Sequence, residues 1–321
     1  MTPAEHRARF DPKRYASITM EFRCNLRCEH CMIEGTMDRL HPGRRQDFEA
    51  LLARNRAERR WHGLILTGSE ITLHRDLPEL ARRAHQSGFR HVRIQTHGMH
   101  LAKADYLARL VDAGVDEFFV SVAGSDAASH DRITTVRGSF DKTLRGLENL
   151  EQYPHVVSLT NTVVTERSYR LLPDVVERLA HLKRLVQMEF WAYWPMREDD
   201  AKDLIPRHQD VLPYLRRAIE RCRAHGREIE IKNFPACLLG TDAHLVYNDQ
   251  PNLFIDPAFW DEFMRNGFYQ CVHRERCAAS ECLGLNTAYI RKYGHEATAL
   301  TPLAEDPAAR RWGEPPAVKR A

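Results

Sequence analysis

The sequence predicts an α/β protein: a partial parallel (β/α)6 barrel followed by a small cysteine-rich C-terminal domain. Short runs of β-branched and aromatic residues alternate with helical patterns over residues 15–195. Several of these runs are apolar throughout, which is typical of strands buried on both faces of a parallel sheet. Residues 233–284 are instead rich in turns and hold four cysteines, which sets them apart from the regular pattern before them.

Six strands and five helices are expected in the first part of the chain. The predicted strands are residues 15–22, 63–66, 91–96, 117–122, 157–164 and 186–193. The predicted helices are residues 48–60, 77–86, 103–113, 140–151 and 170–182. Gly88 and Gly114 follow two of these helices, at the position where glycine commonly ends a helix. Since a closed barrel needs eight β/α units, we expect this sheet to remain open.

The rest of the chain divides into shorter regions. We predict a helix at 208–224 and a strand at 228–232, and a final helix at 286–294 that closes over the cysteine-rich region. The tail is rich in Ala, Pro and Arg, and we expect it to be disordered. The predicted divisions are an N-terminal extension (1–14), the barrel (15–195), a connector (196–232), the cysteine-rich domain (233–300) and the tail (301–321).

Composition excludes several functional classes. The chain is 43% hydrophobic and 28% charged, an ordinary composition for a globular protein. Its net charge is +3, from 47 basic and 44 acidic residues, so we do not expect nucleic acid to be a partner. No apolar run approaches the roughly 20 residues that cross a bilayer. The N-terminus has no apolar signal core, so we expect a cytoplasmic protein without a membrane partner.

Three cysteines after the first strand form a candidate metal site. In a cytoplasmic protein, eight cysteines favour metal or redox chemistry over disulfides. Cys24, Cys28 and Cys31 are spaced C-x3-C-x2-C, at the strand end where parallel barrels gather their functional groups. Three thiolates can hold three irons of a cubane and leave the fourth iron open. The alternative is a zinc site completed by His30 or by a distant residue.

The motifs after the following strands resemble those of the radical S-adenosylmethionine (SAM) superfamily, whose defining motif is C-x3-C-x2-C in this context. The resemblance covers about residues 15–195, and the motifs occur in the expected order. In this chain they read Thr67-Gly68-Ser69-Glu70, Gln95-Thr96-His97-Gly98, Ser121-Val122-Ala123-Gly124, His130-Asp131 and Arg137-Gly138-Ser139-Phe140.

The resemblance implies a [4Fe–4S] cluster held by the three cysteines, with SAM bound to the fourth iron through its amino and carboxylate groups. The backbone at Gly68 would approach the SAM ammonium, reinforced by Glu70. Ser121 would hydrogen-bond the ribose or carboxylate end of SAM. Arg137, or less favourably Arg132, would pair with the SAM carboxylate.

Three departures from the family pattern and one open alternative accompany this assignment. His30 stands where the family usually has an aromatic residue packed on adenine, and an imidazole can still stack there. Ser69 replaces the second glycine of the family's Gly-Gly-Glu motif, which keeps a small residue at the backbone approach. Asn161 would reach the SAM ribose from the fifth strand, or it is an amide that satisfies neighbouring backbone. His97 replaces an asparagine and has packing as its simpler explanation.

A second group of cysteines lies in the turn-rich region. Cys237, Cys271, Cys277 and Cys282 supply the four thiolates that a closed cubane requires. The resemblance favours an auxiliary [4Fe–4S] cluster of the Twitch or SPASM type over structural zinc, although the ligand spacing is not the standard one. The remaining cysteine, Cys222, lies in a predicted helix and is expected to be a small buried hydrophobic residue.

The end of the sixth strand should face the barrel mouth. Because side chains alternate along a strand, either Glu189, Trp191 and Tyr193 or Phe190 and Trp194 point inward, unless the segment only packs in the core.

The resemblance implies reductive cleavage of SAM to a 5′-deoxyadenosyl radical, which abstracts hydrogen from the substrate. An external one-electron donor such as flavodoxin or ferredoxin would supply the electron. Only about 14 residues precede the first strand, which leaves no room for a peptide-binding domain there, so we favour a small biosynthetic intermediate: a sugar, nucleoside or amino-acid derivative. The alternatives are a peptide-modifying enzyme and, in another class, a zinc-bound structural or regulatory protein.

Overall fold

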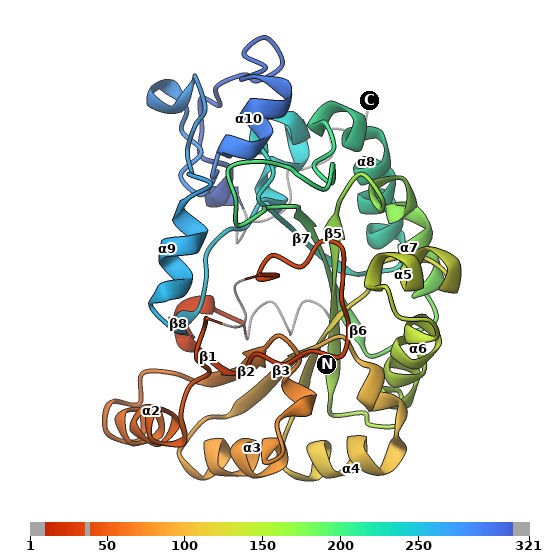
Figure 1. Ribbon diagram of the computed structural model, residues 1–321, viewed down its shortest axis with the longest axis vertical. Coiled ribbons are helices and arrows are strands. Elements are labelled where there is room, and N and C mark those ends of the chain that lie inside the picture. Colours follow the sequence, from red (N-terminus) through yellow and green to blue (C-terminus); the bar gives the residue numbers. More distant parts are fainter. Residues whose placement is uncertain (1–9, 36–38, 311–321) are drawn as a thin grey trace.

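One parallel sheet forms the centre of the computed structural model, which describes residues 10–35 and 39–310 (Figure 1). Its strands lie in the order β7-β6-β5-β4-β3-β2-β1-β8, and β7 and β8 are the two edges, so the barrel is open. The strands are β1 (Tyr15–Glu21), β2 (Gly63–Gly68), β3 (His91–Thr96), β4 (Glu117–Ser121), β5 (Val157–Val164), β6 (Leu185–Ala192), β7 (Glu228–Lys232) and β8 (Asn252–Phe254).

Helices cover the outer face of this sheet (Figure 1). Leu64, Ile94 and Phe118 of the strands and Leu80 and Leu107 of the helices belong to one core and are fully buried. Burial on this face explains why the strands are so apolar. The covering helices are α2 (Arg45–Glu58), α3 (Leu77–Gln86), α4 (Ala104–Asp112), α5 (Ala127–Thr134), α6 (Ser139–Leu150), α7 (Leu172–Arg178) and α8 (His208–Ala224).

The opposite face of the sheet is polar along several strands. Arg93 and Gln95 of β3 alternate with the buried Val92 and Ile94, and both line a cavity inside the barrel. On β6, Glu189 and Trp191 line the same cavity, whereas Phe190 packs in the core against the helices. The first of the two inward sets expected for β6 is therefore the one that faces the cavity, together with Tyr193. Trp194, from the other set, also lines it.

Two strands from the second half of the chain extend the six expected strands to eight. Strand β7, which we had placed in the connector, pairs with β6. Strand β8, within the predicted cysteine-rich domain, pairs with β1. Strand β8 has only three residues and follows Pro251, so it is too short to give a period in the sequence.

Two helices were also missed. Helix α5 has eight residues and begins at Asp126, whose side chain accepts a hydrogen bond from the backbone N–H of Ser129 (2.8 Å). Helix α9 (Ala258–Met264) has seven residues and none of them is buried. Helices this short bury too little apolar surface to leave a 3.6-residue pattern.

We expected the tail to be disordered, but its described part, residues 301–310, is packed against the rest of the protein. The backbone N–H of Ala278 donates to the carbonyl of Leu303 (2.8 Å), and the Leu303 side chain lies against the main core. Helix α10 (Thr287–Tyr293) lies where the final helix was expected. Residues 311–321 of the predicted disordered tail lie outside the described residues. Within the described residues, the helices are all too short or too polar to cross a membrane.

Candidate active site

The first three cysteines lie in the loop that follows β1, at the mouth of the barrel. Cys24, Cys28 and Cys31 all line the barrel cavity. Burial, followed by smaller effects that include the neighbouring thiols, raises the pKa of Cys24 to about 11 and that of Cys28 to about 12. Thiols this reluctant to ionise need a nearby cation before they act as thiolate ligands.

The loop is held in place by the end of α5. Backbone N–H groups of Arg27 and Glu29 donate to the carbonyls of Thr134 (3.2 Å) and Ile133 (2.9 Å). The Thr135 hydroxyl donates to the carbonyl of Arg27 (2.9 Å). These bonds satisfy carbonyls at a helix C-terminus and fix the backbone between the cysteines.

Gly68 lies where β2 meets the loop side of the cavity. The N–H of Ser69 donates to the carbonyl of Glu21 (2.8 Å), and the register of β1 shifts at this point. A Cβ atom on Gly68 would lie 1.9 Å from that carbonyl oxygen, so only glycine fits. Gly68 and Ser69 both line the cavity, which leaves their backbone accessible to a ligand.

Glu70 does not line the cavity; it is a buried residue that fixes the neighbouring backbone through hydrogen bonds. Its side chain is fully buried and accepts hydrogen bonds from the Thr96 hydroxyl (2.6 Å) and the backbone N–H of His97 (2.8 Å), and from both the N–H (3.0 Å) and the hydroxyl of Thr72. The carboxylate joins the end of β2 to the end of β3. Its effect on a ligand therefore passes through the backbone that it fixes.

Ser121 and Asn161 face the cavity from neighbouring strands. They are register partners on β4 and β5, and the Ser121 hydroxyl donates to Oδ1 of Asn161 (2.8 Å). Both residues line the cavity. The amide oxygen of Asn161 is therefore held by Ser121, and the amide nitrogen is the donor that Asn161 can offer to a ribose or carboxylate oxygen.

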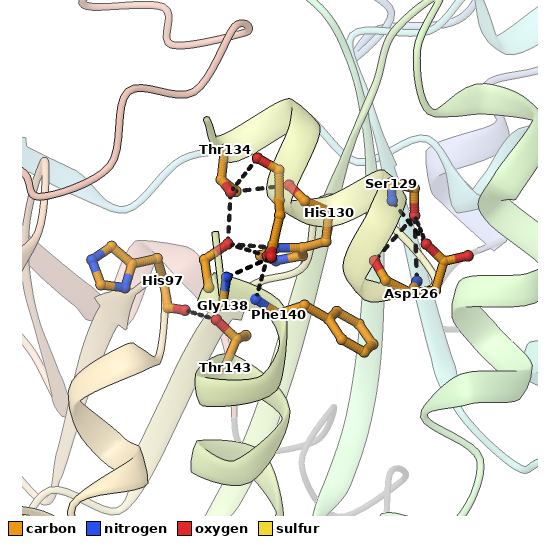
Figure 2. A network of polar contacts seen from close by, with 10 residues as sticks. His97, Asp126, Ser129, His130, Thr134, Gly138, Phe140 and Thr143 are labelled. Atoms are coloured by element: carbon orange, nitrogen blue, oxygen red, sulfur yellow. Dashed lines mark hydrogen bonds and ion pairs between the residues drawn. The ribbon is translucent and has the colours of Figure 1, made fainter. Parts of the chain in front are cut away.

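The motif at residues 130–140 supports the cluster loop through a hydrogen-bond network (Figure 2). Asp131 accepts from the N–H groups of Gly138 (2.5 Å) and Phe140 (2.8 Å) and from the Ser139 hydroxyl (2.8 Å). Burial alone would raise the pKa of Asp131, but these hydrogen bonds hold it below its ordinary value. Asp131 thus caps α6 and links it to α5.

Arg137 is not brought to the cavity. Its side chain is exposed on the turn between α5 and α6, and neither Arg137 nor Arg132 lines the cavity. The predicted pairing of Arg137 with the SAM carboxylate therefore has no support in the geometry. The motif that contains it acts on the fold of the loop instead.

Two histidines present unpartnered nitrogens toward the cavity. Within the described residues, Nδ1 of His30 and Nε2 of His130 are buried without a hydrogen-bond partner, and both residues line the cavity. Burial lowers the pKa of each histidine to about 4, so both rings are neutral at pH 7. Buried polar atoms without partners indicate a site that a polar ligand completes.

The cavity itself has a volume of about 860 Å³. Its floor is made of four charged side chains, Arg93, Glu189, Glu230 and Lys232. The sequence analysis placed Glu189 in one of two sets of side chains that could point inward. It did not identify the other three as site residues. The alternation of polar and apolar residues in β3 and β7 is the signal that would have found them. An aromatic wall also lines the cavity; it is formed by Trp194, Phe259, Trp260, Phe263, Phe268 and Tyr269.

The second group of cysteines is assembled by the C-terminal region. Cys237, Cys271, Cys277 and Cys282 are near enough for their thiols to interact electrostatically. Backbone N–H groups point at the sulfurs: that of His273 donates to Cys271 (3.5 Å) and that of Leu303 to Cys277 (3.4 Å). Such bonds stabilise thiolate ligands and tune a bound cluster.

The two cysteine groups hold the ligand sets that a cubane requires. Three thiolates line the cavity, and four more gather in the C-terminal region. Across the described residues, no three cysteine sulfurs lie within 4.8 Å of one another. A cubane spreads its ligands over the corners of a body larger than a single zinc ion, so both groups are compatible with a cubane.

Comparison with known proteins agrees with this site. The family model "Radical SAM superfamily" matches residues 19–186, slightly more than half of the chain. The chain belongs to the radical SAM superfamily. Members of this superfamily are enzymes that use a [4Fe–4S] cluster and SAM.

Two curated relatives match 54% and 76% of this chain. The chain is 34% identical over 175 residues to a "Probable GTP 3',8-cyclase" of Methanopyrus kandleri, covering 54% of each protein. It is 27% identical over 246 residues to the "Fe-coproporphyrin III synthase" of Methanosarcina barkeri, covering 76% of this chain and 59% of that protein. The chain thus spans little more than half the length of these relatives.

Solved structures agree on the fold. Streptococcus suis SuiB bound to S-adenosylmethionine superposes with a TM-score of 0.55 at 16% identity, covering 71% of this chain and 52% of that one. The protein described as "Native anSMEcpe with bound AdoMet" superposes with a TM-score of 0.55 at 18% identity, covering 71% and 66%. At these identities the likeness concerns the radical SAM fold alone.

Proposed function

We propose that this radical SAM enzyme acts on a small biosynthetic intermediate bound in the barrel cavity. The observation that carries the proposal is that a single cavity joins the three cysteines of the mouth to the charged groups of the floor. Its volume of about 860 Å³ lies within the usual range for small-molecule sites, about 300–1,000 Å³. A space of this size suits SAM and a compact partner better than an extended peptide.

The cysteines of the mouth would hold the cluster, and the residues beside them would hold SAM. Gly68, Ser69, Ser121, Asn161 and His30 all line the cavity near its mouth. When bound, the cluster and SAM supply a 5′-deoxyadenosyl radical that abstracts hydrogen from a C–H bond. The protein contributes orientation and exclusion of water.

The four C-terminal cysteines would hold an auxiliary [4Fe–4S] cluster. Because four thiolates complete a cubane, this cluster would have no open iron for substrate. Its role would be to exchange an electron with the bound substrate or to stabilise the C-terminal region. An external donor such as flavodoxin or ferredoxin would supply the electron for SAM cleavage.

Anaerobic reconstitution tests the proposal. The wild-type protein should hold about eight irons per chain, as two cubanes require, and should form 5′-deoxyadenosine from SAM under dithionite. Changing Cys24, Cys28 and Cys31 together to Ala should leave about four irons and abolish 5′-deoxyadenosine formation. Cys222→Ala, which changes a buried cysteine in neither group, should retain both properties. Persistent SAM cleavage in the triple variant, or zinc in place of iron, would overturn the assignment.

A further inference from the structure

A row of polar side chains crosses four neighbouring strands at one level of the barrel. Register pairs Ser121 with Asn161, Asn161 with Glu189, and Glu189 with Glu230. Register partners on parallel strands point to the same face of the sheet, and all four residues line the cavity. The row therefore runs from the residues proposed to contact SAM to two carboxylates farther along the floor.

The first of these carboxylates lacks a cationic partner. Glu189 accepts hydrogen bonds from Nε2 of Gln187 (2.8 Å) and Nε1 of Trp191 (2.6 Å), both neutral groups. Within the described residues, Glu189 has no ion pair although it is only 4% exposed. Its two oxygens have four lone-pair sites, so two acceptor sites remain after these bonds.

The two cationic side chains of the floor, Arg93 and Lys232, form ion pairs with carboxylates other than Glu189. Nε of Arg93 lies 2.8 Å from a carboxylate oxygen of Glu117. Nζ of Lys232 lies 3.2 Å from Oε2 of Glu230 and donates to the carbonyl of Tyr247 (2.9 Å). Glu117 and Glu230 thus each pair with one of these two cations, and among the described residues Glu189 is the carboxyl of this group that is left without an ion pair.

We propose that Glu189 and Glu230 bind a protonated amino group of the substrate, so that the substrate is a small amine such as an amino sugar or an amino-acid derivative. The proposal rests on the proposed function, since it names the substrate class of the same cavity. An ammonium group supplies both the missing charge and N–H donors for the open acceptor sites. A phosphate or carboxylate group would meet repulsion at this position, and a hydroxyl group would leave the charge unbalanced.

The raised pKa of Glu189 is consistent with a site that binds a cation. Burial, and then the charge of Glu230, raises its pKa to about 7, while Lys232 and Arg93 act weakly in the opposite direction. Without a ligand the carboxyl is therefore about half protonated at pH 7 and largely protonated at lower pH. A bound ammonium would keep it ionised, and binding should release a proton.

Calorimetry on the reconstituted enzyme with SAM present tests the proposal. The probes are D-glucosamine, tyramine and L-lysinamide, each compared with its N-acetylated form, in which an amine is replaced by a neutral amide. We expect at least one amine to bind about tenfold more tightly than its acetylated form, as charge-assisted hydrogen bonds allow. Repeating the titration in buffers of different ionisation enthalpy should reveal the released proton.

Variants connect this preference to the two carboxylates. Glu230→Gln and Glu189→Gln keep side-chain volume and should each abolish the preference for the amine. Glu220→Gln, on the exposed outer side of α8, should keep it. If no amine is preferred over its acetylated form, or if the preference survives both substitutions, the proposal is wrong. A preparation that cleaves SAM yet shows no amine preference refutes only this inference, whereas one that holds no cluster and cleaves no SAM refutes the proposed function itself.

Discussion

Glu189 is a buried acid whose pKa lies well above the ordinary value of 4.5, at about 7. Between these two pH values the folded protein binds more protons at this group than the unfolded chain does. The contribution of Glu189 to the free energy of unfolding therefore falls as the pH rises from about 4.5 to 7. Glu189→Gln removes this contribution while it retains a hydrogen-bonding side chain.

We therefore expect Glu189→Gln to be more stable relative to wild type at about pH 8 than at about pH 5.5. Denaturant unfolding of both proteins at the two pH values measures the difference. Glu220→Gln is the matched control because it changes an exposed carboxyl, and its stability relative to wild type should not depend on pH in this range. A parallel pH dependence in wild type and Glu189→Gln would contradict the raised pKa.

Gly68 has no room for a side chain because the Glu21 carbonyl lies against it. Gly68→Ala should lower the free energy of unfolding by about 1–3 kcal/mol, as overpacking does elsewhere, and should weaken SAM binding. Gly226→Ala is the comparison, since that glycine lies in the turn after α8 with open space around it. It should leave SAM affinity unchanged. Equal SAM affinity in Gly68→Ala and wild type would exclude the backbone of Gly68 from the site.

Individual residues were predicted unevenly from the sequence. The cysteine groups and Gly68 could be identified because their spacing or size is itself the chemical requirement. Glu70 shares a motif with Gly68, but its side chain is enclosed by Thr96 and His97. Arg137 belongs to the later Arg137–Phe140 motif, and its side chain is exposed. Which way a motif side chain points depends on the packing of helices α5 and α6, and the sequence does not determine that directly.

The turn between α5 and α6 connects the helical layer to the cluster loop. Asp131→Asn replaces one accepting oxygen with a donor that faces the Gly138 and Phe140 N–H groups and the Ser139 hydroxyl. We expect a loss of about 1–3 kcal/mol of stability. Since Thr134 and Ile133 of α5 hold the cysteine loop, iron at the first site should also become more labile.

Thermal unfolding and the rate of iron release to a chelator measure these two effects. Asp126→Asn is the control, because Asp126 caps the other end of α5 and is exposed (Figure 2). It should cost at most about 2 kcal/mol and leave the rate of iron release unchanged. If Asp131→Asn and Asp126→Asn release iron at the same rate, the turn between α5 and α6 does not stabilise the loop that holds the first three cysteines.

Elements with a clear hydrophobic period were predicted well, whereas strand β8 and helix α9 were not. Helix α3 and strand β3 were predicted at their observed bounds, because a buried face gives each a clear period. Strand β8 and helix α9 have three and seven residues. Their conformations depend on pairing with β1 and on the aromatic wall, which are contacts with distant parts of the chain.

At the scale of the whole molecule, the C-terminal cysteines tie the last part of the chain to the barrel. Cys277→Ser should lower the iron content from about eight to about four per chain. It should also increase hydrogen exchange at residues 271–303, because Leu303 is held by the Cys277 sulfur and the Ala278 N–H.

Metal analysis and hydrogen exchange measured by mass spectrometry test this expectation. In Cys222→Ala, used as the control, the iron content and the exchange of residues 271–303 should match wild type. An unchanged iron content in Cys277→Ser would remove Cys277 from the ligand set. Loss of iron without any change in exchange would mean that the cluster does not stabilise this region.

The open sheet and the two cysteine groups could be predicted, but their joint architecture could not. The sequence indicates two separate regions, whereas β7 and β8 make the second half of the chain part of the barrel sheet. Parallel pairing over such distances leaves no local pattern, since β1 and β8 are separated by most of the chain.

The position of β8 has a consequence for the order of synthesis. As the chain leaves the ribosome, β1 is made early, but the strand that covers its outer edge arrives only after residue 252. Until then β1 presents an unpaired edge, and β6 remains uncovered until β7 emerges. The nascent barrel is therefore open to intermolecular strand pairing at β1 and β6 until β8 and β7 emerge, and the complete sheet presents β7 and the three-residue β8 as its edges instead.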